Sequence, residues 1–124
     1  MARKILLVDD EPGILELLAN RLKANDYEVI TASVGQEGLE KAGKEKPDLM
    51  LLDVMMPEMG GLEVLRHLKK VPETRNIPVI MFTVKAGKED IERAILAGAS
   101  DYITKPFTPR ILLERIKEVC DGKR

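Results

Sequence analysis

Short runs of aliphatic residues recur along the chain at intervals that suit the strands of one sheet. Three of the five runs are continuously apolar instead of alternating, which is typical of parallel strands covered on both faces. The other two runs are more mixed, and we expect them nearer the edges of the sheet. The predicted strands are Ile5–Val8, Val29–Ala32 (mixed), Leu49–Leu52, Val79–Thr83 and Asp101–Thr104 (mixed).

Helical spacing of apolar residues follows each of these runs. The weakest predicted helix is Gln36–Glu45, because it has few apolar residues and two glycines. Asp10 or Glu11 is a candidate cap for the first helix, whose first turn suits Pro12. The other apolar stretches run from Ile14 to Leu22, Leu62 to Leu68, Ile91 to Ile95 and Ile111 to Val119, with start signals at Thr108 and Pro109 and end signals at Pro72, Gly98 and Gly122.

This alternation of strand and helix, repeated five times, predicts an α/β fold. Right-handed crossovers then place helices on both faces of a parallel sheet. The length of 124 residues suits one domain over residues 1–124. An apolar share of 44% is enough for a hydrophobic core and excludes wholesale disorder.

Charge and cysteine content exclude several classes of protein. The chain has 20 basic and 21 acidic residues, a net charge of −1, which argues against a dedicated nucleic-acid binder. Its single cysteine, Cys120, cannot form an internal disulfide. No early apolar run is long enough for a signal peptide or a membrane span. We therefore expect a cytoplasmic protein that binds neither nucleic acid nor a membrane.

Polar residues follow four of the predicted strands, at the point where each strand ends. Asp9 and Asp10 follow the first strand, and Asp53 follows the third. Thr83 ends the fourth strand, and Lys105 follows the fifth. Because ligands of an open parallel sheet bind beyond the carboxyl ends of its strands, we expect these side chains in one site. Each residue alone is more often a cap, a turn residue or a solvated charge, so the argument rests on their conjunction.

Three clustered carboxylates repel one another unless a cation joins them or one of them is protonated. Oxygen ligands of this kind favour Mg²⁺. Zinc lacks a Cys/His ligand set here, since the only histidine, His67, falls on a predicted helix away from this edge. A metal beside a carboxylate, with an amine and a hydroxyl opposite, suits transfer of a phosphoryl group to that carboxylate. Glycine-rich phosphate loops do not occur in the sequence, which argues against nucleotide binding.

The chain resembles the receiver domain of bacterial two-component response regulators over essentially its whole length. Four ordered segments carry the resemblance: Ile5–Pro12, Leu51–Pro57, Met81–Thr83 and Asp101–Phe107. The resemblance implies a flavodoxin-like fold with a five-stranded parallel sheet in the order 2-1-3-4-5 and five helices on both faces. It also implies a phosphorelay protein that switches a partner-binding surface, and not an enzyme acting on external substrates.

The resemblance assigns the acidic residues to phosphoryl and metal chemistry. Asp53 resembles the phosphoacceptor, which takes its phosphoryl group from a phosphohistidine of a sensor kinase or a phosphotransfer protein. Asp10 would bind Mg²⁺ directly, and Asp9 partly through water. Asp53 and the backbone carbonyl of Met55 would supply further metal oxygens.

The resemblance also implies roles for the residues opposite the acids. Thr83 and Lys105 would bind the phosphoryl group, and Tyr102 would turn inward when Thr83 moves toward it. The Lys105–Pro106 bond resembles a cis peptide of the family, a geometry accessible mainly before proline. Val84 departs from the family, which usually has alanine or glycine after the threonine, and we expect its branched side chain to narrow access to Asp53.

Three other functions remain possible from the residues alone. They are a Mg²⁺-dependent phosphohydrolase with an aspartyl nucleophile, an interaction module that works without phosphate, and a flavin binder. The chain reaches Arg124 soon after the last predicted helix. We therefore expect either a single-domain regulator acting on an output protein or a piece of a longer regulator with a detached output domain.

Overall fold

Five strands and five helices alternate along the chain in the computed structural model, which describes residues 3–84 and 87–122. The strands are β1 (Lys4–Val8), β2 (Glu28–Ala32), β3 (Leu49–Asp53), β4 (Val79–Thr83) and β5 (Asp101–Thr104). The helices are α1 (Pro12–Lys23), α2 (Gly35–Glu45), α3 (Gly61–Lys70), α4 (Lys88–Leu96) and α5 (Pro109–Cys120). The predicted elements are all present, with ends shifted by a few residues.

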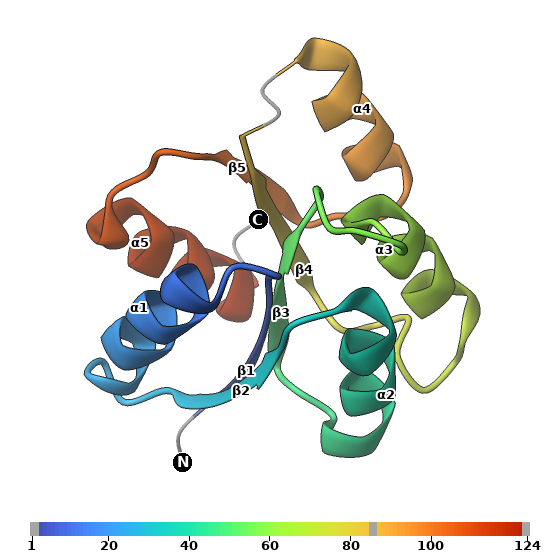
Figure 1. Cartoon of the computed structure of the whole chain (residues 1–124). Helices are drawn as coiled ribbons and strands as arrows, with labels where there is room; N and C mark the ends of the chain where they lie inside the picture. The colour runs from blue at the N-terminus through green and yellow to red at the C-terminus, as the bar shows by residue number, and fades with distance from the viewer. Residues whose placement is uncertain (1–2, 85–86, 123–124) are drawn as a thin grey trace.

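The strands form one parallel sheet in the order β2-β1-β3-β4-β5, as the resemblance implies. The two mixed runs, β2 and β5, are the edge strands, and the residues of β3 and β4 are buried throughout. Helices α1 and α5 cover one face, and α2, α3 and α4 cover the other (Figure 1). A parallel sheet needs such crossover helices, because each connection must return to the starting edge.

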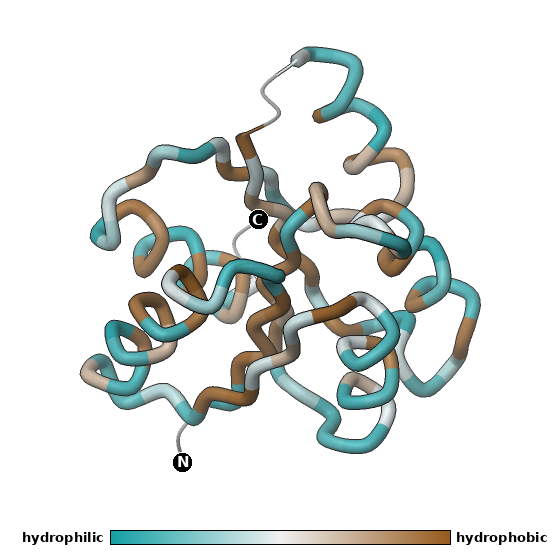
Figure 2. Tube along the Cα trace, in the orientation of Figure 1, coloured by the Kyte–Doolittle hydropathy of each residue, from teal (hydrophilic) through white to brown (hydrophobic). Residues whose placement is uncertain are grey.

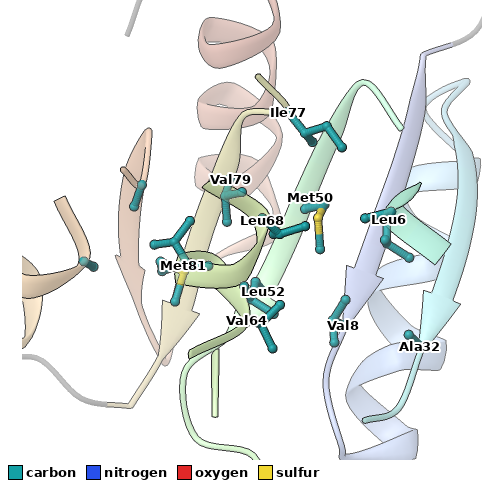
Figure 3. Packing of buried hydrophobic residues seen from close by; sticks show 14 of the residues in the cluster. Leu6, Val8, Ala32, Met50, Leu52, Val64, Leu68, Ile77, Val79 and Met81 are labelled. Carbon is teal, nitrogen blue, oxygen red and sulfur yellow. The ribbon is translucent and has the colours of Figure 1, made fainter. Parts of the chain in front are cut away.

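Side chains along each strand alternate between two hydrophobic cores, one on each face of the sheet. The core under α2, α3 and α4, which we call the α2–α4 core, contains Leu6, Val8, Met50 and Leu52 (Figure 3). The alternate positions of the same strands join α1 and α5 in the α1/α5 core, which contains Ile5, Leu7, Leu49, Leu51, Ile80, Phe82, Ile103, Leu18, Leu22, Leu112 and Ile116. Figure 2 shows the corresponding apolar band through the central strands.

The predicted cap of α1 is wrong in one respect. Glu11 occupies the N-cap position, but neither it nor another side chain caps α1 there. Its backbone N–H instead donates to Asp9 Oδ1 at 2.9 Å. The side chain of Asp9 thus orders the turn between β1 and α1, and Pro12 begins the helix as expected.

Two other helix ends follow the sequence signals. Thr108 caps α5, because its hydroxyl accepts a hydrogen bond from the N–H of Ile111 at 3.2 Å. Gly98 follows the end of α4 with a φ of +110°, a conformation that favours glycine. The N–H of Gly98 donates to the Ile95 carbonyl, and the N–H of Ala99 donates to the Ala94 carbonyl. This pair of hydrogen bonds is the Schellman motif that ends many helices.

Candidate functional site

The register of the sheet explains why the predicted site residues meet. In the β1–β3 ladder Val8 lies opposite Leu52, so Asp9 and Asp53 come next at the same level. In the β3–β4 ladder Asp53 itself lies opposite Phe82. The acids that follow β1 and end β3 are therefore neighbours at the carboxyl edge of the sheet.

The basic residue joins this edge from β5. Thr83 lies opposite Thr104, and Lys105 comes next and donates its backbone N–H to the Thr83 carbonyl at 2.7 Å. Its Nζ reaches back to Asp9 Oδ2 at 3.1 Å and to Asp53 Oδ2 at 3.6 Å. One ammonium group thus bridges two of the three clustered acids.

The three acids form one compact group of possible metal ligands. Oxygen atoms of Asp9, Asp10 and Asp53 all lie within 4.8 Å of one another. Asp9 is fully buried and Asp53 is 3% exposed, whereas Asp10 is half-buried. Three negative charges against one ammonium leave this cluster with an excess of negative charge in the metal-free protein.

The pKa of Asp53 reflects this environment. Loss of water on burial raises the pKa of its carboxyl group to about 6. The Met55 N–H, which donates to Asp53 Oδ1 at 3.2 Å, lowers that pKa, and the Asp9 charge raises it. The ammonium of Lys105 lowers it, and the charge of Asp10 raises it further. Burial in the site therefore disfavours the charged form of Asp53.

A glycine sets the path of the chain behind Asp53. Gly61, the first residue of α3, donates its N–H to the Val54 carbonyl at 2.9 Å. A Cβ atom at Gly61 would collide with the Asp53 carbonyl group, with 2.8 Å to its carbon. The sequence marks the Gly60–Gly61 pair as a loop signal, but only the structure shows this close approach.

Thr83 and Tyr102 lie on the side of the α2–α4 core. Thr83 is fully buried at the end of β4, and Tyr102 is half-buried and packs against that core. The peptide bond between Lys105 and Pro106 is cis. The structure thus brings Thr83 and Lys105 to the same edge of the sheet as the three acids.

An apolar groove of about 420 Å³ opens beside Lys105 on the α1 side. Val84, which is 64% exposed, forms part of its wall. The other lining residues include Ile14, Leu17 and Leu18 of α1 and Pro106 and Phe107 of the loop after β5. His67, by contrast, is an exposed residue of α3, and its Nε2 lies 3.8 Å from Glu63 Oε2.

Comparison with known proteins identifies the family. A family model for the response regulator receiver domain matches residues 5–117, which is most of the chain. The chain belongs to this family. Receiver domains are phosphorylated on an aspartate by histidine kinases of two-component systems, so the predicted family and class of function are confirmed.

Curated relatives of this receiver domain are regulators. It is 45% identical over 119 residues to the alkaline phosphatase synthesis transcriptional regulatory protein PhoP of Bacillus subtilis, covering 96% of this chain and 49% of PhoP. It is 42% identical to the phosphate regulon transcriptional regulatory protein PhoB of Escherichia coli, covering 96% of this chain and 52% of PhoB. This receiver domain spans about half the length of these relatives.

Solved structures support the fold independently. A CheY-like receiver domain protein from Methanospirillum hungatei superposes with a TM-score of 0.93 at 38% identity, covering 99% of this chain and 97% of the other.

Within residues 3–84 and 87–122, no helix combines the length and the apolar character that a membrane span requires.

Proposed function

We propose that Asp53 is the phosphoacceptor of this receiver domain, which extends over residues 1–124. The observation that carries the proposal is the contact of Asp53 Oδ2 with Lys105 Nζ at 3.6 Å, inside a cluster of three acids at the carboxyl edge of the sheet. Asp53 ends β3 and is almost wholly buried, so the sheet fixes its position. A fixed, partly desolvated carboxylate beside an ammonium group suits nucleophilic attack on phosphorus.

The transfer step is a displacement at phosphorus. An oxygen lone pair of Asp53 forms the new O–P bond, and the N–P bond of the donor phosphohistidine breaks with its electron pair returning to the imidazole ring. Lys105 donates N–H groups to the phosphoryl oxygens and offsets their charge, and the Thr83 hydroxyl donates to one of them. The product is an aspartyl phosphate on this chain.

The acid cluster fits a hard divalent cation by its chemistry. Its donors are carboxylate oxygens from Asp9, Asp10 and Asp53 that lie within 4.8 Å of one another, and such oxygens are the ligands that Mg²⁺ prefers. Asp10 and Asp53 would hold the ion with the Met55 carbonyl, and Asp9 partly through water. Bound Mg²⁺ would supply positive charge that offsets both the acid cluster and the incoming phosphoryl oxygens.

Phosphorylation would act on partners through the β4–β5 side of the sheet. The added phosphoryl group carries a charge of roughly −1.5 to −2 and draws Thr83 and Lys105 toward it. Tyr102 then fills the space that Thr83 leaves, and the surface of α4, β5 and α5 changes. The partners we propose are a sensor histidine kinase or phosphotransfer protein and an output protein or domain, with no direct contact to nucleic acid or membrane by this chain, which works in the cytoplasm.

Intact-mass measurement after incubation with acetyl phosphate tests the assignment. We expect the wild type to gain one phosphoryl group in the presence of Mg²⁺, in a bond that survives acid and is lost in base. Asp53→Asn should gain none. The matched control is Asp26→Asn, an exposed residue with a positive φ that asparagine tolerates, and it should label like the wild type. Full labelling of Asp53→Asn would disprove the assignment.

A separate assay of phosphoester turnover distinguishes a receiver domain from a phosphohydrolase. A receiver domain forms one aspartyl phosphate and does not turn over unrelated phosphoesters. Rapid, repeated hydrolysis of several external phosphoesters by the wild type, lost in Asp53→Asn, would instead favour the hydrolase function.

A further inference from the structure

The Lys105 ammonium has a third neighbour besides its two carboxylates. Its Nζ lies 4.8 Å from the centroid of the Phe82 ring. We propose that Phe82 is a positioning residue for Lys105, whose ammonium it holds at the phosphoryl site through the face of its ring. The proposal rests on the function proposed for Asp53, because it concerns the lysine that contacts the same carboxylate.

The Phe82 ring is itself held in place. Phe82 is fully buried in the α1/α5 core and lies opposite Asp53 in the ladder between β3 and β4. Phe107 packs edge-on against it, with ring centroids 6.2 Å apart and an interplanar angle of 80°. A buried ring that is braced by a second ring gives the ammonium a fixed surface.

The two carboxylates and the ring differ as partners of Lys105. We expect Asp9 and Asp53 to bind the cation and the phosphoryl group. Their oxygens are then shared between these ligands and Lys105. Phe82 has no such competing role, and its attraction for a cation uses the ring quadrupole without occupying an N–H donor. Phe82 can therefore keep Lys105 in place while leaving its donors available to phosphoryl oxygens.

The burial of the ammonium strengthens this contact. The Lys105 side chain is 13% exposed, and cation–π attraction grows as the cation loses water. Leucine or another aliphatic residue at position 82 would fill the core but would offer no quadrupole. The proposal therefore separates the electronic role of Phe82 from its role in packing.

The first test observes the contact in the metal-free protein, without any phosphoryl transfer. A cation over an aromatic face places its neighbouring methylene protons in the ring current. We expect the Lys105 Hε resonances to be shifted upfield in the wild type and to return toward ordinary values in Phe82→Leu. Ordinary Hε shifts in the wild type would overturn the proposal.

The second test measures labelling by acetyl phosphate with Mg²⁺ in proteins carrying fluorinated phenylalanine at position 82. Each added fluorine weakens the quadrupole with little change in ring shape. We expect the rate to fall stepwise through mono-, di- and trifluorophenylalanine, by about threefold to tenfold at the end of the series. The matched control is the same series at position 82 in the Lys105→Met background, where fluorination should leave the remaining rate nearly unchanged. Equal rates across the series at position 82 with Lys105 present would overturn the proposal.

A double-mutant cycle shows whether Phe82 acts through Lys105. Phe82→Leu should slow labelling in the wild-type background, and the effect should disappear in Lys105→Met. An equal effect in both backgrounds would mean that Phe82 serves packing alone, which overturns the proposal. Failure of the wild type to label at Asp53 is a different result, since it refutes the phosphoacceptor assignment itself.

Discussion

At the scale of single residues, the proposed acceptor works against the stability of the fold. Asp53 is buried among like charges, and its pKa stands at about 6 instead of the ordinary 3.8. In the metal-free protein the native state therefore binds a proton more tightly than the unfolded chain does. The contribution of this group to stability is fully present below pH 3.8 and is lost as the pH rises through 6.

This sign predicts how Asp53→Asn changes stability. At pH 7.5 without metal, we expect the variant to be more stable than the wild type by about 1–3 kcal/mol, because asparagine carries no charge to bury. The gain should shrink toward pH 5, where Asp53 is largely protonated. Urea unfolding of both proteins at the two pH values measures it, with Asp26→Asn as the control. An equal difference at both pH values would contradict the cause we give.

Val84 is a second residue with a testable effect. It forms part of the wall of the groove beside Lys105 and is 64% exposed. The branched side chain of Val84 follows Thr83 directly. We therefore expect the wild type to be labelled by acetyl phosphate, or to lose its phosphoryl group, more slowly than Val84→Ala. A steric effect of up to about 1.4 kcal/mol corresponds to a rate difference of about twofold to tenfold. Equal rates of both reactions in the two proteins would remove the idea.

The sequence predicts that the acids and Lys105 meet at one edge of the sheet, for a reason that also explains why it misses the contact of Phe82. Asp9, Asp53 and Lys105 each follow a predicted strand, and parallel strands bring their carboxyl ends to one edge. Phe82 lies inside a strand, where its pattern is that of any core residue. Its contact with a lysine 23 positions later depends on packing between β4 and the loop after β5, which periodicity does not describe.

At the scale of elements, the start of α3 lies close against the backbone of Asp53. Gly61→Ala places a methyl group against the Asp53 carbonyl group. We expect a loss of about 1–3 kcal/mol from overpacking, together with slower labelling as Asp53 shifts. Chemical denaturation and the mass assay measure the two effects.

Gly43→Ala is the matched control for that variant. Gly43 also lies in a helix, α2, but nothing stands within 4 Å of the added Cβ atom. We expect a gain of about 0.5–1 kcal/mol from helix propensity and unchanged labelling. If both alanine variants changed stability alike, close approach to Asp53 would not explain the glycine at position 61.

Element boundaries show where sequence patterns are weakest. The strands are predicted to within one residue, and the continuous runs Ile5–Val8 and Leu49–Leu52 each stop at a charged residue on both sides. The cap of α1 is not predicted correctly. The Glu11 side chain makes no cap hydrogen bond, and the Asp9 carboxylate instead accepts from the Glu11 N–H in the turn before the helix. Local sequence preference does not predict whether an acidic side chain near a helix end caps that helix or orders the turn before it. The answer depends on the three-dimensional geometry.

At the scale of the whole molecule, filling the acid cluster should stabilise the fold. A ligand that binds only the native state raises the free energy of unfolding, by about 2.7 kcal/mol at a concentration one hundred times its dissociation constant. We expect Mg²⁺ to raise the urea midpoint of the wild type in this way. Asp10→Asn should respond much less, and Asp26→Asn should respond fully. If Mg²⁺ left the urea midpoint of the wild type unchanged, this result would contradict the proposed metal site.

The two hydrophobic cores share no residue among those that the structure describes. Phe82 and Ile103 belong to one core, while Met81 and Tyr102, their neighbours in the chain, pack in or against the other. The exteriors of the two helical layers can therefore diverge separately during evolution, each accommodating its own binding partners. Because neighbouring residues of β4 and β5 face opposite cores, we expect a change in either strand next to Asp53 to reach both helical layers.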